Sequence, residues 1–128
     1  MKPLTLVIDL DGVLTVKKEW IDYSDEDFLS VEPDVIVIGV VNTLFDSGNR
    51  IIIHTSRRWE DENVTKVWLS KHGVKFHVLV LGKPLGDHYI DDKNMSVKEL
   101  VSLYDKNTPI TQNTRFGNLP YLHPTDFL

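Results

Sequence analysis

Residues 4–15, LTLVIDLDGVLT, decide the fold that we predict for this chain. The stretch starts as a run of branched apolar residues with no polar face, which is typical of a strand buried on both sides in a parallel sheet. Two carboxylates, Asp9 and Asp11, interrupt this run, and Gly12 follows them. Open α/β sheets bind ligands at the carboxyl edge of their strands, so the two acids indicate a site there. The alternative, a plain surface turn, is less consistent with so apolar a strand.

Length and composition indicate one globular domain of ordinary makeup. The chain has 128 residues, of which 41% are hydrophobic and 26% charged. A net charge of −5 argues against an extended basic surface, so we expect no nucleic-acid partner. The absence of cysteine excludes disulfides, thiolate metal sites and a cysteine nucleophile. No signal peptide or membrane-spanning stretch is recognisable, so we expect a cytoplasmic protein with no membrane partner.

The rest of the chain alternates between strand-like and helix-like patterns. The expected strands span residues 50–54, 76–81 and 88–91, and the expected helices span residues 34–47, 60–72 and 96–106. Such alternation implies right-handed crossovers between parallel strands. We therefore predict an α/β fold, a three-layer Rossmann-like parallel sheet with helices on both faces and the first strand at its centre.

Two stretches show no such periodicity. Residues 16–33 are polar with scattered aromatics and are expected to form a loop or small hairpin over the strand edge. Residues 107–128 contain three prolines and several aromatics, a composition that argues against disorder. We expect them to form an irregular C-terminal tail packed on the domain of residues 1–106, either beside the site or over the flank of the sheet.

Polar side chains at the predicted strand ends should gather at one edge of the sheet. They are Asp9, Asp11, Thr55, Asp91 and Asp92, with Lys83 nearby. Several carboxylates at one place favour a hard divalent cation, and Mg²⁺ fits best because it takes few carboxylates together with phosphate oxygens. A lysine and a threonine opposite the acids suit an anion lying between them and the metal.

This set of groups predicts phosphoryl transfer through a covalent intermediate. An aspartate can attack phosphorus to give an aspartyl phosphate, and a second aspartate two residues on can protonate the leaving oxygen. Gly12, Ser56 and Arg57 are expected to bind substrate, since they adjoin Asp11 or Thr55. For Arg57, an ordinary surface charge is the equally weighted alternative.

Four motifs together resemble those of the haloacid dehalogenase (HAD) superfamily. They are VIDLDGVLT, IIIHT, Lys83 and YIDD, in the same order and spacing over residues 4–105. IHTSRR, WLSKHGV and GKPLGDHYIDDKN further resemble the small capsule biosynthesis phosphatases of that superfamily. The resemblance implies a nucleophile at Asp9, a general acid/base at Asp11, and Thr55 and Lys83 on the phosphate.

The same resemblance implies a bound Mg²⁺. Its expected ligands are Asp9, the main-chain carbonyl of Asp11 and the fourth-motif acids Asp91 and Asp92, with Asp91 favoured as the direct ligand. The intervals between the motifs, about 35 and about 25 residues, are too short for the cap domain that many superfamily members carry. Residues 16–33, the tail or a neighbouring subunit in a homo-oligomer would then shield the site from water.

The sequence therefore predicts a Mg²⁺-dependent phosphatase that hydrolyses a small phosphorylated metabolite, with a sugar phosphate favoured. A nucleotide or a sugar-acid phosphate is the alternative substrate. A signalling receiver domain is a rival of another class, but Thr55 stands where a receiver needs its phosphoacceptor aspartate. An inactive, partner-binding relative is the second rival, and the intact acids argue against it.

Overall fold

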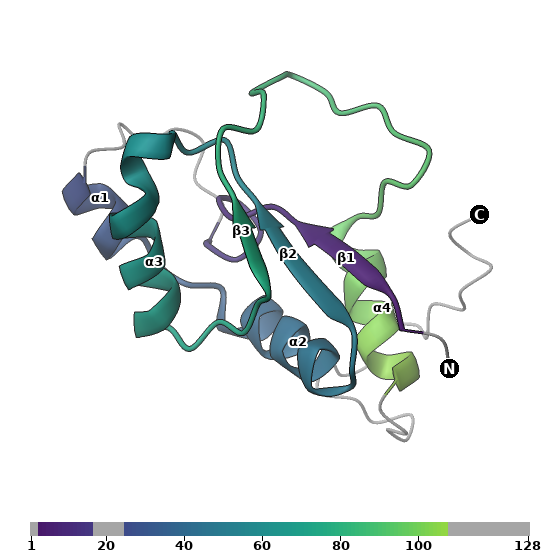
Figure 1. The fold of residues 1–128 in the computed structure, drawn as a ribbon. Helices are drawn as coiled ribbons and strands as arrows, with labels where there is room; N and C mark the ends of the chain where they lie inside the picture. The colour runs from purple at the N-terminus through teal and green to yellow at the C-terminus, as the bar shows by residue number, and fades with distance from the viewer. Residues whose placement is uncertain (1–2, 17–24, 108–128) are drawn as a thin grey trace. The chain divides into compact units, whose positions relative to one another are not determined.

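The computed structural model describes residues 3–16 and 25–107 (Figure 1). Within the chain, contacts define two compact units, Met1–Asp87 and His88–Leu128. Almost all of the expected C-terminal tail, and residues 17–24 of the stretch over the strand edge, lie outside the described residues, so the predictions on the tail stay predictions.

The first unit is built on a parallel sheet. In the described part of the chain the sheet has three strands, β1 (Thr5–Ile8), β2 (Arg50–His54) and β3 (Val78–Val80), in the order β1-β2-β3. Both pairs are parallel, with Ile8 opposite Ile53 and His54 opposite Val80. The carboxyl ends of the three strands therefore lie at one edge of the sheet, and the prediction of a parallel α/β fold flanked by helices is confirmed.

The position of β1 differs from the prediction. In the described sheet β2 lies between the other two strands, and β1 lies at the edge. Val7 is 60% exposed, whereas Ile51 and Ile53 on β2 are fully buried. The prediction of a central first strand, buried on both faces, was wrong because a short branched apolar run suits edge and centre alike.

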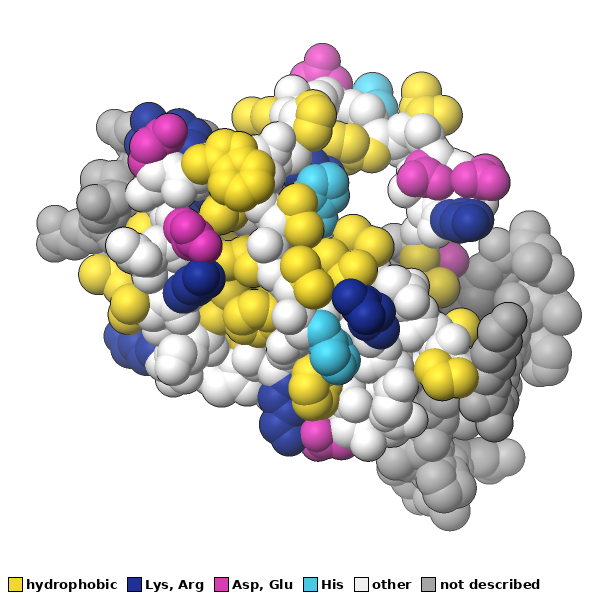
Figure 2. All heavy atoms as spheres, viewed as in Figure 1, with side chains coloured by type: hydrophobic (Ala, Val, Ile, Leu, Met, Phe, Trp, Pro, Cys, Tyr) yellow, Lys and Arg dark blue, Asp and Glu magenta, His cyan; other side chains and the backbone are white. Residues whose placement is uncertain are grey.

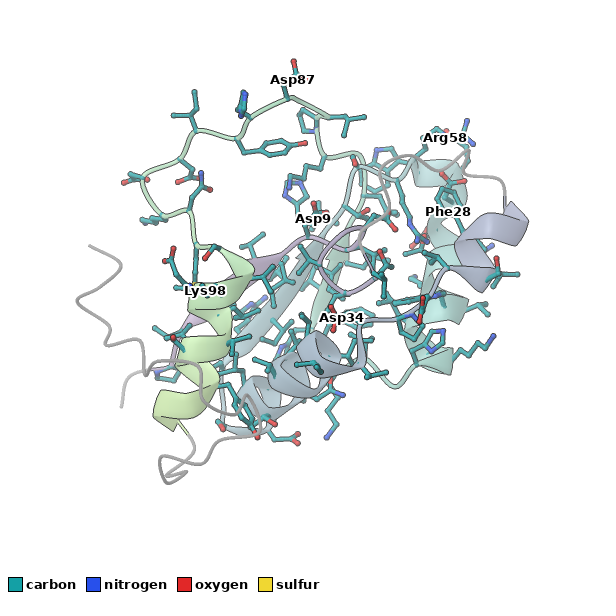
Figure 3. The ribbon with its side chains drawn as sticks, turned by 180° about the vertical axis from the view of Figure 1, so that it is seen from behind. Asp9, Phe28, Asp34, Arg58, Asp87 and Lys98 are labelled. Atoms are coloured by element: carbon teal, nitrogen blue, oxygen red, sulfur yellow. The ribbon has the colours of Figure 1, made fainter. Side chains whose placement is uncertain are left out.

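Two helices of the first unit confirm their predictions. α2 (Val35–Asp46) begins where Asp34 Oδ1 accepts the N–H of Val37 at 3.1 Å, and it ends before Gly48, whose φ of 94° suits a helix stop. It lies against one face of the sheet, on the near side in Figure 3. α3 (Glu62–Lys71) follows a short 3₁₀ turn, η1 (Trp59–Asp61).

A further helix lies where a loop or hairpin was expected. α1 (Asp25–Ser30) occupies part of the stretch 16–33 and packs against α3. The two ends of that stretch approach each other through an antiparallel bridge between Thr15 and Pro33. The expectation of a loop or small hairpin was wrong for residues 25–30, since six residues are too few to display a helical period in the sequence.

The side chain of Trp68 connects α3 to the chain that follows α1. It is fully buried, and its Nε1 donates a hydrogen bond to the carbonyl of Val31 at 2.9 Å. The bond gives a partner to two buried polar groups, the indole N–H of Trp68 and the carbonyl of Val31.

We expect Trp68→Phe to lower the free energy of unfolding by about 1–3 kcal/mol, because it leaves the buried Val31 carbonyl without its donor and removes ring volume. Denaturant unfolding of the variant and the wild type measures the difference. Trp59→Phe is the matched control, since Trp59 is 66% exposed and should change stability by less than about 0.5 kcal/mol. Equal effects of both substitutions would contradict the role of the Trp68 bond.

In the second unit, one predicted element is present and another is absent. α4 (Val97–Asn107) begins at Ser96, whose Oγ accepts the N–H of Glu99 at 3.2 Å, as the sequence predicts. The stretch 81–96 contains no strand, so the prediction of a strand at residues 88–91 was wrong. Ile90, the apolar residue that suggested burial, is 98% exposed.

Local hydrogen bonds explain why residues 88–91 form no strand. Asn94 Nδ2 donates to the carbonyl of Tyr89 at 2.6 Å, and the N–H of Lys93 donates to Asp91 Oδ1 at 2.9 Å. Asparagine and aspartate side chains of this kind offer the backbone a turn in place of a sheet ladder.

The described surface carries scattered apolar side chains. Figure 2 shows hydrophobic groups among polar ones over α3 and β3, and Val67 on α3 is 55% exposed. Single exposed apolar residues of this kind are normal. Within residues 3–16 and 25–107, no helix has the length and apolar character needed to cross a membrane.

Candidate active site

A tight turn after β1 carries the two acids of the first motif. The carbonyl of Leu10 accepts three main-chain N–H groups from this turn, the shortest at 2.8 Å. Gly12 has a φ of 85°, which favours glycine, and its N–H donates to Thr15 Oγ1 at 2.9 Å. Asp9 and Asp11 are therefore held on a fixed turn at the carboxyl end of β1.

Asp9 lies beside Lys83. One of its oxygens, Oδ1, accepts the N–H of Leu10 at 2.8 Å, and the other, Oδ2, lies 3.6 Å from Lys83 Nζ. The Asp9 side chain is 35% exposed and that of Lys83 is 18% exposed. A half-exposed carboxylate beside an ammonium group can meet an incoming anion, since the cation offsets the repulsion between the two negative charges. In Figure 3, Asp9 lies at the end of its strand.

Thr55 is joined to the loop of Lys83 through the main chain. Its N–H donates to the carbonyl of Val80, and its own carbonyl accepts the N–H of Lys83, both at 2.9 Å. Asp9 and Thr55 each come one residue after the end of their strand, β1 and β2 respectively. The structure thus gathers Asp9, Thr55 and Lys83, three residues predicted from separate parts of the sequence, at one edge.

Gly82 fixes the approach to Lys83. It has a φ of 76°, and a Cβ at this position would lie only 2.9 Å from Trp59 Nε1. Its N–H donates to the carbonyl of Arg57 at 2.9 Å. This backbone conformation favours glycine, and the hydrogen bond from Gly82 to Arg57 joins the two loops of the site.

Arg57 forms an ion pair with Asp11. Its Nε and Nη2 donate to Asp11 Oδ2 and Oδ1, each at 2.9 Å, and Nη1 donates to Thr65 Oγ1 at 3.2 Å. The guanidinium carbon lies 4.2 Å from the centre of the Phe28 ring. Arg57 is 4% exposed, so the alternative of an ordinary surface charge is excluded.

Three contributors to this arrangement were not among the predicted site residues. Phe28 comes from α1 and Thr65 from α3, while Thr15 closes the turn of the first motif. Only Thr65 leaves a signal in the sequence, because it stands three residues before Trp68 on the buried face of α3. A polar residue at a buried helix position requires a polar partner.

The four remaining predicted site residues are Gly12, Ser56, Asp91 and Asp92, and they belong to different units of the chain. Gly12 is exposed and Ser56 is half-buried, and their contact with substrate stays a prediction. Asp91 and Asp92 are exposed residues of the second unit. The N–H of Lys93, and then a hydrogen bond with the Asp92 side chain, lower the pKa of Asp91 below its ordinary value. Their convergence with Asp9 also stays a prediction.

The donor atoms of the first unit fit a hard cation. Asp9 offers carboxylate oxygens, while both side-chain oxygens of Asp11 bind Arg57, so Asp11 would contribute its main-chain carbonyl. Over the described ranges no three acidic or histidine side chains cluster into a complete metal site. Such a set still suits Mg²⁺, which keeps several waters and needs only one or two carboxylates from the protein.

Comparison with solved structures finds six matching chains, three of which illustrate the likeness. A structural-genomics target from Vibrio cholerae is 27% identical with a TM-score of 0.58, and the match covers 82% of this chain and 99% of that one. A chain of the Pnkp1/Rnl/Hen1 complex is 21% identical with a TM-score of 0.55, over 70% of this chain and 31% of that one.

A chain from a second structure, of the Pnkp1/Rnl/Hen1 RNA repair complex, is 15% identical with a TM-score of 0.55, over 81% of this chain and 31% of that one. This chain therefore spans about a third of the repair-complex chains that it matches. No protein-family model matches the sequence. No curated protein matches it either. What these comparisons show is an α/β fold that the chain shares with the three structures.

Proposed function

We propose that this protein is a Mg²⁺-dependent phosphatase that hydrolyses a small phosphorylated metabolite, with a sugar phosphate as the favoured substrate. The observation that carries the proposal is the pairing of Asp9 with Lys83 at the carboxyl end of β1, with Thr55 joined to the same loop. A nucleophilic carboxylate, a cation and a hydroxyl group at one strand edge are the groups that phosphoryl transfer needs.

The reaction proceeds in two steps on the residues of the chain. An Asp9 oxygen attacks phosphorus, the ester P–O bond breaks, and the leaving oxygen takes a proton from Asp11. Water then attacks the aspartyl phosphate and gives a proton to Asp11, which releases inorganic phosphate and restores Asp9. Lys83 and Thr55 bind the phosphoryl oxygens in both steps.

Mg²⁺ would be held by Asp9, the Asp11 carbonyl and the acids Asp91 and Asp92, and it would supply positive charge to the phosphoryl group. The motif resemblance supports a capless HAD-type phosphatase, with a role in capsule polysaccharide biosynthesis as the narrower proposal. The α/β fold shared with chains of an RNA repair complex is consistent with phosphoester chemistry.

Phosphate release from a panel of phosphomonoesters tests this function. The panel contains hexose phosphates, sugar-acid phosphates and nucleotides, each assayed with Mg²⁺. We expect kcat/KM for the best hexose phosphate to be at least about tenfold higher than for any sugar-acid phosphate or nucleotide. A preference for sugar-acid phosphates or nucleotides would select the alternative substrate class. No release from any ester would refute the phosphatase proposal.

A further inference from the structure

Contacts on three sides fix the side chain of Arg57. Two of its nitrogens bind Asp11, a third binds Thr65 on α3, and Phe28 of α1 lies against its guanidinium. Its main chain is also tied, because its N–H donates to Thr55 Oγ1 at 3.1 Å. Phe28, which is labelled in Figure 3, is the residue that α1 contributes to these contacts.

A purely structural role explains this pair poorly. The Arg57 side chain is 2% exposed and that of Asp11 is 23% exposed, so both charges are partly removed from water. Desolvation of such a pair offsets much of the attraction between its members, and apolar side chains of similar volume often stabilise a fold as well. What an apolar pair could not supply is a fixed direction for the Asp11 carboxylate.

A role as substrate ligand also fits the contacts poorly. Three of the five guanidinium N–H groups already donate to side chains of the protein, the paired donors on Nε and Nη2 are both taken by Asp11, and the side chain is only 2% exposed. A substrate phosphate or carboxylate would have to displace Asp11 to reach the same donors. The contacts therefore favour an action of Arg57 through Asp11.

We propose that Arg57 is a positioning residue that aligns Asp11 for its two proton transfers, with Thr65 and Phe28 holding the guanidinium in place. This inference rests on the proposed phosphatase function and assigns Arg57 a role other than substrate binding. Without Arg57, Asp11 can still turn into the productive direction but spends little time in it. Misplacement of a reacting group by about 1 Å can cost about a hundredfold in rate.

The two half-reactions depend differently on Asp11. p-Nitrophenyl phosphate releases a stable phenolate, so its transfer to Asp9 needs little help from an acid. Hydrolysis of the aspartyl phosphate needs Asp11 as a base whatever the substrate was. An Arg57 variant should therefore release nitrophenol in a rapid burst and then turn over slowly, whereas an alkyl phosphate should give no burst.

The test is stopped-flow and steady-state kinetics of Arg57→Lys and Arg57→Ala with p-nitrophenyl phosphate and an alkyl phosphate, in Mg²⁺. We expect kcat to fall about a hundredfold with KM changed less than about threefold. The burst should approach one nitrophenol per folded chain. Millimolar guanidinium should restore part of the kcat of Arg57→Ala by filling the vacated space beside Asp11.

Controls separate this inference from misfolding and from failure of the proposed function. Arg58→Ala is the matched control, because the neighbouring Arg58 side chain is 73% exposed and should leave kcat and KM unchanged. Phe28→Leu keeps an apolar side chain against Arg57 and should lower kcat less than Arg57→Lys does. Phe28→Leu therefore tests whether the contacts around Arg57 affect kcat, even where Arg57→Ala fails to fold.

The outcomes are distinct. A raised KM with unchanged kcat in Arg57→Lys would make Arg57 a substrate ligand and overturn the inference while leaving the phosphatase intact. Unchanged kcat and KM in a folded Arg57 variant would overturn it as well. A wild-type chain that hydrolyses neither of these two esters nor any ester of the substrate panel would refute the proposed function and the inference together.

Discussion

Asp9→Asn is expected to lower phosphate release by at least about a thousandfold while the protein stays folded. The amide is nearly the same size as the carboxylate but cannot attack phosphorus. Asp9 is 35% exposed, and its contact with Lys83 Nζ spans 3.6 Å, so loss of this exposed pair should change the free energy of unfolding by less than about 1 kcal/mol. Phosphate release and thermal unfolding of the same preparation measure both effects.

Asp46→Asn is the matched control for this experiment. Asp46 is also an acid paired with a lysine, Lys75, at 2.8 Å, but it lies on the exposed end of α2. We expect this substitution to leave phosphate release unchanged. A folded Asp9→Asn protein with substantial remaining activity would remove Asp9 from the role of nucleophile.

Removal of divalent metal is expected to abolish turnover, and added Mg²⁺ is expected to restore it. Asp9 and Lys83 alone leave much of the charge of a phosphoryl group uncompensated, which is the reason to expect a cation. Ca²⁺ should support the reaction poorly, since it takes more ligands at longer distances and would misplace the phosphoryl group. The measurement is phosphate release after chelation, with each metal added back in excess of the chelator.

A readout apart from activity accompanies the metal experiment. If Mg²⁺ binds the folded chain, its addition should raise the thermal midpoint, and the rise should be smaller in Asp9→Asn. Full turnover by the chelated protein would contradict the assignment of a metal to this site. A rise in the midpoint of equal size in both proteins would show that Mg²⁺ binds elsewhere.

The sequence predicted the elements with strong local signals. β2 follows from a run of three isoleucines, and α2 follows from apolar periodicity between an aspartate cap and Gly48. The pairing of Asp9 with Lys83 could be predicted because parallel strands bring their ends to one edge, whatever their separation in the chain. The order of the motifs in the sequence indicated that Lys83 is the lysine that belongs to the site.

Other features depend on contacts that leave no local pattern. The edge position of β1 is a property of the whole sheet, and its residues would suit either place. The pairing of Arg57 with Asp11 requires α1 and α3 to meet around the guanidinium, and one of several aromatics in a polar stretch does not reveal this. The strand expected at residues 88–91 failed because asparagine and aspartate side chains bind the backbone locally.

The hydrogen bonds that join Thr55 to Lys83 and Arg57 to Gly82 run entirely through peptide groups. Exchange of the side chain at position 55 or 83 therefore alters the chemistry offered to a ligand without breaking either bond. Insertion or deletion of one residue between positions 80 and 83 would break both at once. For protein engineers, positions 55 and 83 therefore accept other side chains, whereas the length of the loop between positions 80 and 83 has to stay unaltered.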